Sequence, residues 1–208
     1  MKTTILIMGF LLLLVFQSYT QYSHKIEPLY KFMQANADTT IVIEQVSNWI
    51  SVAPNVYLLS KKGDTLNCFT YRDLAYSRSN SVLIPTHIRQ SMYKVHKHKI
   101  LTEPVDVNEF FSVCAIKQET LQDLWKQIHR LRPWTLSDDK VDGEGCGVNG
   151  RKSPVIYDGG GLNLYLITGN EIKQLYFYAP AFYQKYCKWR RGREAVLKIE
   201  GLFREYVQ

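Results

Sequence analysis

Alternating apolar and polar residues predict a β-hairpin in the C-terminal third of the chain. Apolar side chains fall on every second position of two segments: Leu162, Leu164 and Leu166, then Leu175 and Phe177. Gly169 and Asn170 lie between them and are typical of a two-residue turn, which pairs Leu164 with Leu175 and Leu162 with Phe177. A slip of one residue would turn these side chains to the other face, so we expect a firm register. The reverse face is also apolar, which indicates that a helix packs against Tyr165, Ile167, Ile172 and Tyr176.

A second hairpin is predicted earlier in the chain, between Val56–Ser60 and Thr65–Tyr71. Gly63, in the connection, can adopt the positive φ that a tight turn needs. The two segments are expected to share an apolar face, with Cys68 pointing inward, and to pair Leu59 with Leu66 and Tyr57 with Cys68.

Apolar residues at i, i+3, i+4 and i+7 predict helices over Gln118–Leu131, Arg193–Tyr206 and Pro85–His98. Pro133 ends the first of these, and we expect it to hold Arg132 in an extended conformation. Ile41–Ile50 fits both the helical and the strand period, and we interpret it as a strand. This order of elements predicts a single α+β domain, with a mainly antiparallel sheet built from the two hairpins and three to four packed helices.

The first twenty residues have the pattern of a secretory signal peptide. Lys2 is their only charge, and an almost unbroken apolar run follows over Ile5–Phe16. The small residues Ser18 and Thr20 precede an expected cut ahead of Gln21. The apolar run is short for a membrane span, although an uncleaved anchor is the alternative. We therefore expect an exported domain of residues 21–208 without a transmembrane helix.

The composition describes a folded chain of ordinary size. Its 208 residues are 46% hydrophobic and 13% aromatic, which excludes a disordered or fibrous protein, and the length excludes a large multidomain enzyme. The 26 basic and 19 acidic residues give a formal charge of +7, which favours anionic partners through long-range attraction. For an exported protein these partners are envelope polymers, lipid head groups or acidic proteins, and nucleic acid is not expected.

Cysteines at positions 68, 114, 146 and 187 allow three full pairings, between which the sequence does not choose. None lies in a Cys-x-x-Cys motif, which argues against a zinc ribbon or a thioredoxin-like centre. An oxidising compartment favours one or two disulfides. We expect Cys146–Cys187, because both cysteines adjoin glycine-rich or basic loops; four buried free thiols are the alternative.

A run of cations beside Cys187 is the strongest candidate for a binding site. This basic segment comprises Lys188, Trp189, Arg190, Arg191 and Arg193. Guanidinium groups bind phosphate or carboxylate through paired hydrogen bonds. Arginines at the start of a helix oppose its dipole, a conflict that a bound anion would remove. The alternative is a solvated turn whose cations pair with the protein's own acids.

Acidic residues gather just before a glycine loop at Gly145–Gly150. A calcium loop laid over Asp138–Asn149 lacks the expected ligands at its third and twelfth positions, Lys140 and Asn149. A looser calcium site remains open, with the carboxylates of Asp138, Asp139, Asp142 and Glu144 as ligands. The glycine loop matches G-x-G-x-x-G but lacks the flanking strand and helix of a dinucleotide site, so no cofactor is expected. The chain holds no G-x-S-x-G, H-E-x-x-H or Walker motif, and we assign no catalytic or metal-binding residue.

Five short segments carry a resemblance to known proteins: Leu124–Ile128, Pro133-Trp134, Gly145-Cys146, Tyr157–Gly160 and Tyr176–Tyr183. Through them, residues 117–206 resemble the C-terminal half of a group of exported proteins of Bacteroidota-type bacteria. The likeness is one of texture rather than of a defined motif. It implies bacterial export, mostly to the periplasm, and no particular chemistry.

These patterns predict an exported, non-enzymatic binding protein of the bacterial envelope, periplasmic or secreted. Its basic segment would contact an anionic envelope component or a protein partner. One alternative is a secreted hydrolase of envelope polymers, which needs two carboxylates about 5–10 Å apart in a cleft, drawn from Asp138, Asp139, Asp142, Glu144 or Asp158. Another is an inhibitor or immunity-type protein with a rigid, disulfide-tied loop. The ligand and the oligomeric state stay open.

Overall fold

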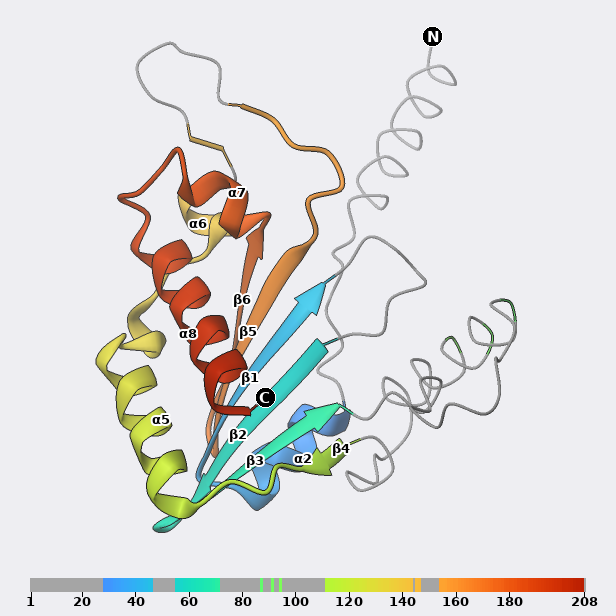
Figure 1. Cartoon of the computed structure of the whole chain (residues 1–208), viewed down its shortest axis with the longest axis vertical. Helices are drawn as coiled ribbons and strands as arrows, with labels where there is room; N and C mark the ends of the chain where they lie inside the picture. Colours follow the sequence, from blue (N-terminus) through green and yellow to red (C-terminus); the bar gives the residue numbers. More distant parts are fainter. Residues whose placement is uncertain are drawn as a thin grey trace, which may run out of the picture.

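The computed structural model describes residues 28–46, 55–71, 111–143, 145–146 and 154–207, with single positions at 87, 91 and 94. Within these ranges a six-stranded sheet has helices on both of its faces (Figure 1). The strand order is β4-β3-β2-β1-β5-β6, and every neighbouring pair is antiparallel. The α+β class predicted from the sequence is therefore confirmed.

The elements follow one another along the chain as α2 (Pro28–Asn36), β1 (Thr39–Val46), β2 (Asn55–Lys62), β3 (Thr65–Tyr71), β4 (Phe111–Val113), α5 (Gln118–Arg130), the 3₁₀ helix η1 (Pro133–Thr135), α6 (Asp139–Asp142), β5 (Gly161–Thr168), β6 (Ile172–Tyr178), α7 (Pro180–Gln184) and α8 (Arg191–Val207). The predicted helices at 118–131 and 193–206 correspond to α5 and α8. The predicted signal peptide and most of the helix predicted over 85–98 lie outside the described residues.

Strand β1 lies in the middle of the sheet, where it joins the two predicted hairpins. The consecutive residues Ile41, Val42 and Ile43 are all buried, because helices cover the sheet on both sides. A strand buried on both faces shows no clean alternation of apolar and polar residues, which explains its ambiguous pattern in the sequence. The sheet thus contains β1 and the short β4 in addition to the hairpins.

Helices α5 and α8 cover one face of the sheet (Figure 1). Each helix contributes a stripe of fully buried side chains at helical spacing: Leu121, Leu124 and Ile128 from α5, and Val196, Ile199 and Phe203 from α8. A polar contact near the C-terminus also joins the two helices, since the Tyr206 hydroxyl donates to Asp123 and accepts from Gln127. This arrangement fixes where α8 begins relative to the end of α5.

Helix α2 packs on the reverse face of the sheet, as the apolar reverse side of β5 predicted. Leu29, Tyr30 and Met33 pack there against a cluster that includes Tyr165 and Ile167. The Tyr30 and Tyr165 rings lie 4.2 Å apart between centroids. In the described parts of the chain, no helix combines the length and apolarity needed to cross a bilayer.

The β5–β6 hairpin has the register that the sequence predicted. Leu164 lies opposite Leu175, and Leu162 lies opposite Phe177. Thr168 and Glu171 exchange backbone hydrogen bonds around the two turn residues.

The predicted register of the β2–β3 hairpin is wrong by two residues. The turn contains only Gly63 and Asp64, so Lys62 pairs with Thr65 and Leu59 lies opposite Cys68. A shift of two residues leaves every side chain on its predicted face. Cys68 is accordingly buried in the core, as expected.

The expected conformation of Arg132 is also wrong. Its backbone is left-handed, with φ 51° and ψ 57°, instead of extended. Its N–H donates to the carbonyl of His129, which satisfies one of the free carbonyls at the C-terminus of α5. The chain therefore reverses within one residue and leads directly into η1.

Gly192 provides the first test of this packing. A Cβ at Gly192 would overlap the carbonyl oxygen of Ser137, whereas a Cβ at Gly201, on the same helix, meets nothing within 4 Å. We expect Gly192→Ala to lower the free energy of unfolding by about 1–3 kcal/mol, as overpacking does. Gly201→Ala is the matched control and should raise it by about 0.5–1 kcal/mol through helix propensity. Urea unfolding followed by circular dichroism measures both, and equal effects of the two changes would contradict the close contact.

Candidate functional site

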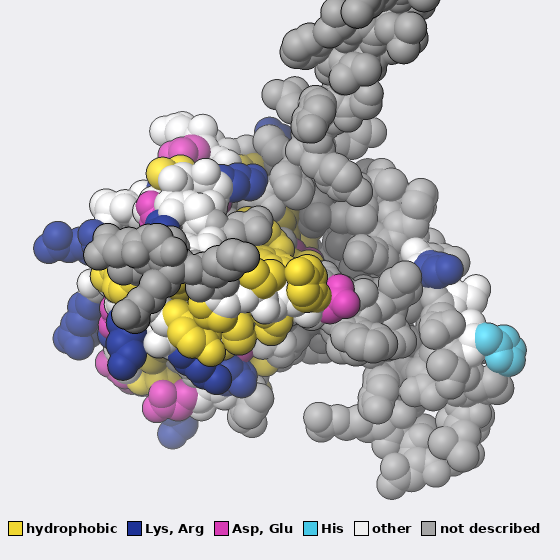
Figure 2. All heavy atoms as spheres, turned by 90° about the horizontal axis from the view of Figure 1, so that it is seen from above, with side chains coloured by type: hydrophobic (Ala, Val, Ile, Leu, Met, Phe, Trp, Pro, Cys, Tyr) yellow, Lys and Arg dark blue, Asp and Glu magenta, His cyan; other side chains and the backbone are white. Residues whose placement is uncertain are grey.

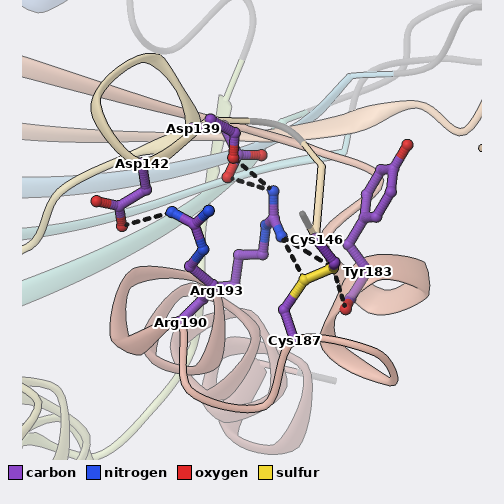
Figure 3. Close-up of a disulfide and its surroundings, with 8 residues drawn as sticks. Asp139, Asp142, Cys146, Tyr183, Cys187, Arg190 and Arg193 are labelled. Atoms are coloured by element: carbon purple, nitrogen blue, oxygen red, sulfur yellow. Dashed lines mark hydrogen bonds and ion pairs between the residues drawn. A yellow bond between two sulfur atoms is a disulfide. The ribbon is translucent and has the colours of Figure 1, made fainter. Parts of the chain in front are cut away.

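The expected disulfide between Cys146 and Cys187 is present and ties the segment after α6 to the segment after α7 (Figure 3). The two Cα atoms are 5.6 Å apart, and both cysteines are buried. They pack with Tyr183 and Ala179 in a small separate cluster. The disulfide therefore fixes the start of the basic segment, which follows Cys187 directly.

Arg193 does not contact a partner from the surface as predicted, because its side chain is only 1% exposed. Its guanidinium forms an ion pair of 2.8 Å with the buried carboxylate of Asp139 and donates to the carbonyl of Gly143 (Figure 3). The same guanidinium lies 3.5 Å from the Cys187 sulfur and 5.1 Å from the Tyr183 ring centroid. Arg193 is thus a structural cation that joins α8 to α6, to α7 and to the disulfide.

Asp138 and Asp139 cover the outer edge of strand β6. Asp138 accepts a hydrogen bond of 3.0 Å from the N–H of Tyr176, and Asp139 accepts one of 2.9 Å from the N–H of Tyr178. On an edge strand, alternate N–H groups point away from the neighbouring strand and need another acceptor. The two carboxylates supply these acceptors in place of a seventh strand.

This arrangement does not fit the looser calcium site that the sequence left open. Asp138 also accepts from the N–H of Lys140, and Asp139 faces Arg193, so both carboxylates are directed at protein donors. Asp142 accepts from Ser137 and lies 3.7 Å from the guanidinium of Arg190. Among the residues that the structure describes, no group of three or more candidate metal ligands is found, and Glu144 lies outside them.

The other four residues of the basic segment reach the surface to different extents. Lys188 is exposed, and the Trp189 side chain is 61% exposed. Arg190 is half-buried beside Asp142. Arg191 is exposed, and its guanidinium donates to the Thr135 hydroxyl at 3.2 Å, which holds it against η1. Three of the four, Lys188, Trp189 and Arg191, therefore expose their side chains for contact with a ligand, while Arg190 faces Asp142.

A pocket of about 320 Å³ lies between the end of α5 and the first two turns of α8. Its lining is mostly cationic: Arg130, Leu131, Arg132, Arg191, Glu194, Ala195 and Lys198. Arg191 belongs both to this pocket and to the basic segment, so the two form one surface. We call this combined surface, with its pocket, the basic surface.

The electrostatics of the pocket favour an anion. Four cations surround it, and its one carboxylate, Glu194, already forms an ion pair of 2.7 Å with Lys198. Arg191 is the first residue of α8, where the positive end of the helix dipole repels a cation and attracts an anion. Seen from above in Figure 2, Lys and Arg side chains lie along the left and lower edges of the described part, beside a hydrophobic area.

The pocket residues Arg130, Arg132 and Lys198 were not predicted from the sequence. Arg130 and Arg132 lie about 60 residues before Arg191, and only the packing of α5 on α8 brings them together. No local signal in the sequence distinguishes the buried Arg193 from the exposed Arg191, because each lies three or four residues before a buried side chain of α8. Arg193 is buried because Asp139, on α6, lies opposite it.

Comparison of the chain with protein-family models, with curated sequences and with solved structures finds no match. The pocket holds one carboxylate, so it does not present the pair of acids that the hydrolase alternative requires.

Replacing Arg193 tests its structural role. We expect Arg193→Met to lower the free energy of unfolding by about 3–5 kcal/mol, because it leaves the Asp139 carboxylate buried without its charge partner. Arg191→Met, an exposed change of the same type on the same helix, should alter it by less than about 0.5 kcal/mol. Urea unfolding measures both variants.

A double variant separates the ion pair from the loss of side-chain volume. In Arg193→Met/Asp139→Asn the buried charge is gone while the acceptor for Tyr178 is kept, so we expect part of the lost stability to return. Urea unfolding of Arg193→Met, Asp139→Asn and the double variant gives three losses of unfolding free energy. If the loss in the double variant equals the sum of the losses in the two single variants, the ion pair is not what holds α6 to α8.

Proposed function

We propose that this protein is an exported, non-enzymatic binding protein of the bacterial envelope, periplasmic or secreted, with one α+β domain over residues 21–208. Its basic surface binds phosphate or carboxylate groups of an anionic envelope component. The observation that carries this proposal is the pocket between α5 and α8, where four cations face one carboxylate. The cations around the pocket repel one another, and a bound anion reduces this repulsion.

Export is supported by the disulfide and by the signal-peptide pattern. Disulfides persist in oxidising compartments and are rare in the reducing cytosol. Cys146 and Cys187 form such a bond, and the first twenty residues have the charge and apolar run of a secretory signal. The resemblance of residues 117–206 to exported proteins of Bacteroidota-type bacteria points the same way.

The basic surface has the features of a site for a charged, flat or extended ligand. Arg191, which lines the pocket, is held in place by its hydrogen bond to Thr135, and this reduces the entropy lost when it binds an anion. Trp189, beside the cations, offers an exposed ring that can enter the interfacial layer of a lipid or stack on a sugar. The pocket takes the anionic group, and the segment from Lys188 to Arg191 makes the surrounding contacts.

Binding to vesicles tests this function. The mature chain is sedimented with vesicles that contain phosphatidylglycerol or only phosphatidylcholine, at low and high salt. We expect binding to the anionic vesicles alone and a weakening as salt rises, because added ions screen the charges. Arg130→Ser/Arg191→Ser should weaken binding about thirtyfold and flatten its salt dependence, given roughly 1 kcal/mol for each basic residue at an anionic surface.

The matched control is Lys31→Ser/Lys62→Ser, which removes the same charge from exposed positions outside the pocket. It should lower affinity only slightly. Equal losses in the two double variants would show that net charge, and not this surface, attracts the vesicles. No binding to vesicles, together with no effect of inorganic phosphate on the thermal stability of the chain, would overturn the proposal.

A further inference from the structure

Two cysteines that take no part in the disulfide lie side by side in the sheet. Cys68 is on β3, and Cys114 follows the last residue of β4. The register that pairs Phe69 with Val113 continues by one step, and the N–H of Cys114 donates to the carbonyl of Cys68 at 2.9 Å. The two cysteines are therefore directly opposite one another on adjacent antiparallel strands.

This position suits a covalent bond between the two sulfurs. Directly opposite residues point to the same face of a sheet, and both cysteines contact the same core cluster. A hydrogen-bonded antiparallel pair has its Cα atoms about 5.5 Å apart, within the range of about 4.4–6.8 Å that disulfides span. The placement of the two cysteines is therefore compatible with a disulfide between them.

The two thiols differ in exposure and in acidity. Cys68 is fully buried, whereas Cys114 is half-buried and so reaches solvent. A hydrogen bond from the Cys68 thiol lowers the pKa of Cys114 to about 7, and a second one from Thr70 acts in the same direction against the effect of burial. The same bond between the thiols, together with burial, raises the pKa of Cys68. The solvent-accessible thiolate of Cys114 therefore lies beside the buried, protonated thiol of Cys68.

We propose that Cys68 and Cys114 form a redox-active dithiol site that reacts once, stoichiometrically, with disulfides, either small or on other proteins, in addition to the binding function proposed above. The Cys114 thiolate attacks one sulfur of the incoming disulfide, the new S–S bond forms, and the first thiolate of the substrate leaves. Cys68 then loses its proton and attacks the Cys114 sulfur, which releases the second thiolate. The two cysteines are oxidised to a disulfide, the substrate is reduced to two thiols, and the two protons of the cysteines end on those thiols.

The site is independent of the basic surface and of any ligand bound there. Cys68 lies on β3 and Cys114 directly after β4, at one side of the sheet, while the pocket lies between α5 and α8. Cys146–Cys187 is buried and bonded, so it does not compete for the substrate. Failure of one proposal would therefore leave the other standing.

The reaction is tested on the folded full chain with oxidised glutathione as the probe. The chain is first treated with mild reductant, which leaves the buried disulfide intact, and is then exposed to the probe and quenched with acid. Intact mass should show the loss of two hydrogen atoms without a retained glutathione, and peptide mapping should place the new bond between Cys68 and Cys114. A retained glutathione, or no reaction while the chain stays folded, would overturn the proposal.

Two variants separate the roles of the cysteines. Cys68→Ser removes the resolving thiol, so the glutathione adduct on Cys114 should persist. Cys114→Ser leaves only the buried thiol, and its reaction should be slower than that of the native chain by a hundredfold or more, an order-of-magnitude expectation for a buried, protonated thiol. A Cys114→Ser chain that reacts at the native rate would contradict the assignment.

The pH dependence of the native chain gives a readout that needs no variant. Because the thiolate is the form that reacts, the rate of Cys114 alkylation by iodoacetamide should fall about tenfold for each pH unit below 7 and level off above it. A midpoint at the ordinary pKa of cysteine, near 8.5, would show that Cys68 does not activate Cys114.

Discussion

The ion pair between Arg193 and Asp139 is the interaction on which the site depends. Removing both charges from water costs several kcal/mol per ion, which further contacts of the two side chains offset in part. Arg193 also contacts the Gly143 carbonyl, the disulfide sulfurs and the Tyr183 ring, and Asp139 also accepts from the edge of β6. One buried contact therefore orients four separate elements: α6, α7, α8 and the outer strand of the sheet.

The disulfide stabilises the same region through its effect on the unfolded chain. It joins residues 41 positions apart, and the intervening chain includes β5, β6 and α7. Closing a loop of this length restricts the unfolded chain by an amount worth about 4 kcal/mol in the entropy model. The ion pair adds direction in the folded state, which the disulfide alone does not supply. Together they hold the first turn of α8 in place, so that Arg191 projects from a rigid support towards the end of α5.

The parts of the sheet that could be predicted from the sequence are those that depend on local patterns, namely the alternation of apolar residues and the identity of turn residues. The β5–β6 register followed from alternation and from the turn residues Gly169 and Asn170. The β2–β3 register did not follow, because pairings that differ by two residues put the same side chains on the same faces. The two registers differ only in where the turn after Lys62 begins and ends, and the alternation of apolar and polar residues does not depend on that. Short elements such as α6 have too few residues for any periodicity and form because tertiary contacts hold them.

The candidate site shows the same division between local and distant information. A run of cations after Cys187 marked the right region, yet residue type did not separate Arg193, which is buried, from Arg191, which is exposed two positions earlier. Helical phase does not separate them either, because Arg193 lies three residues before the buried Val196 and Arg191 lies four residues before the buried Ala195. Asp139 and Arg130 were beyond such reasoning, since each meets α8 only after α5 and α6 have packed against it. In this chain the sequence therefore indicates where charge is concentrated, while the packing of neighbouring elements decides which charges support the fold and which stay at the surface to bind.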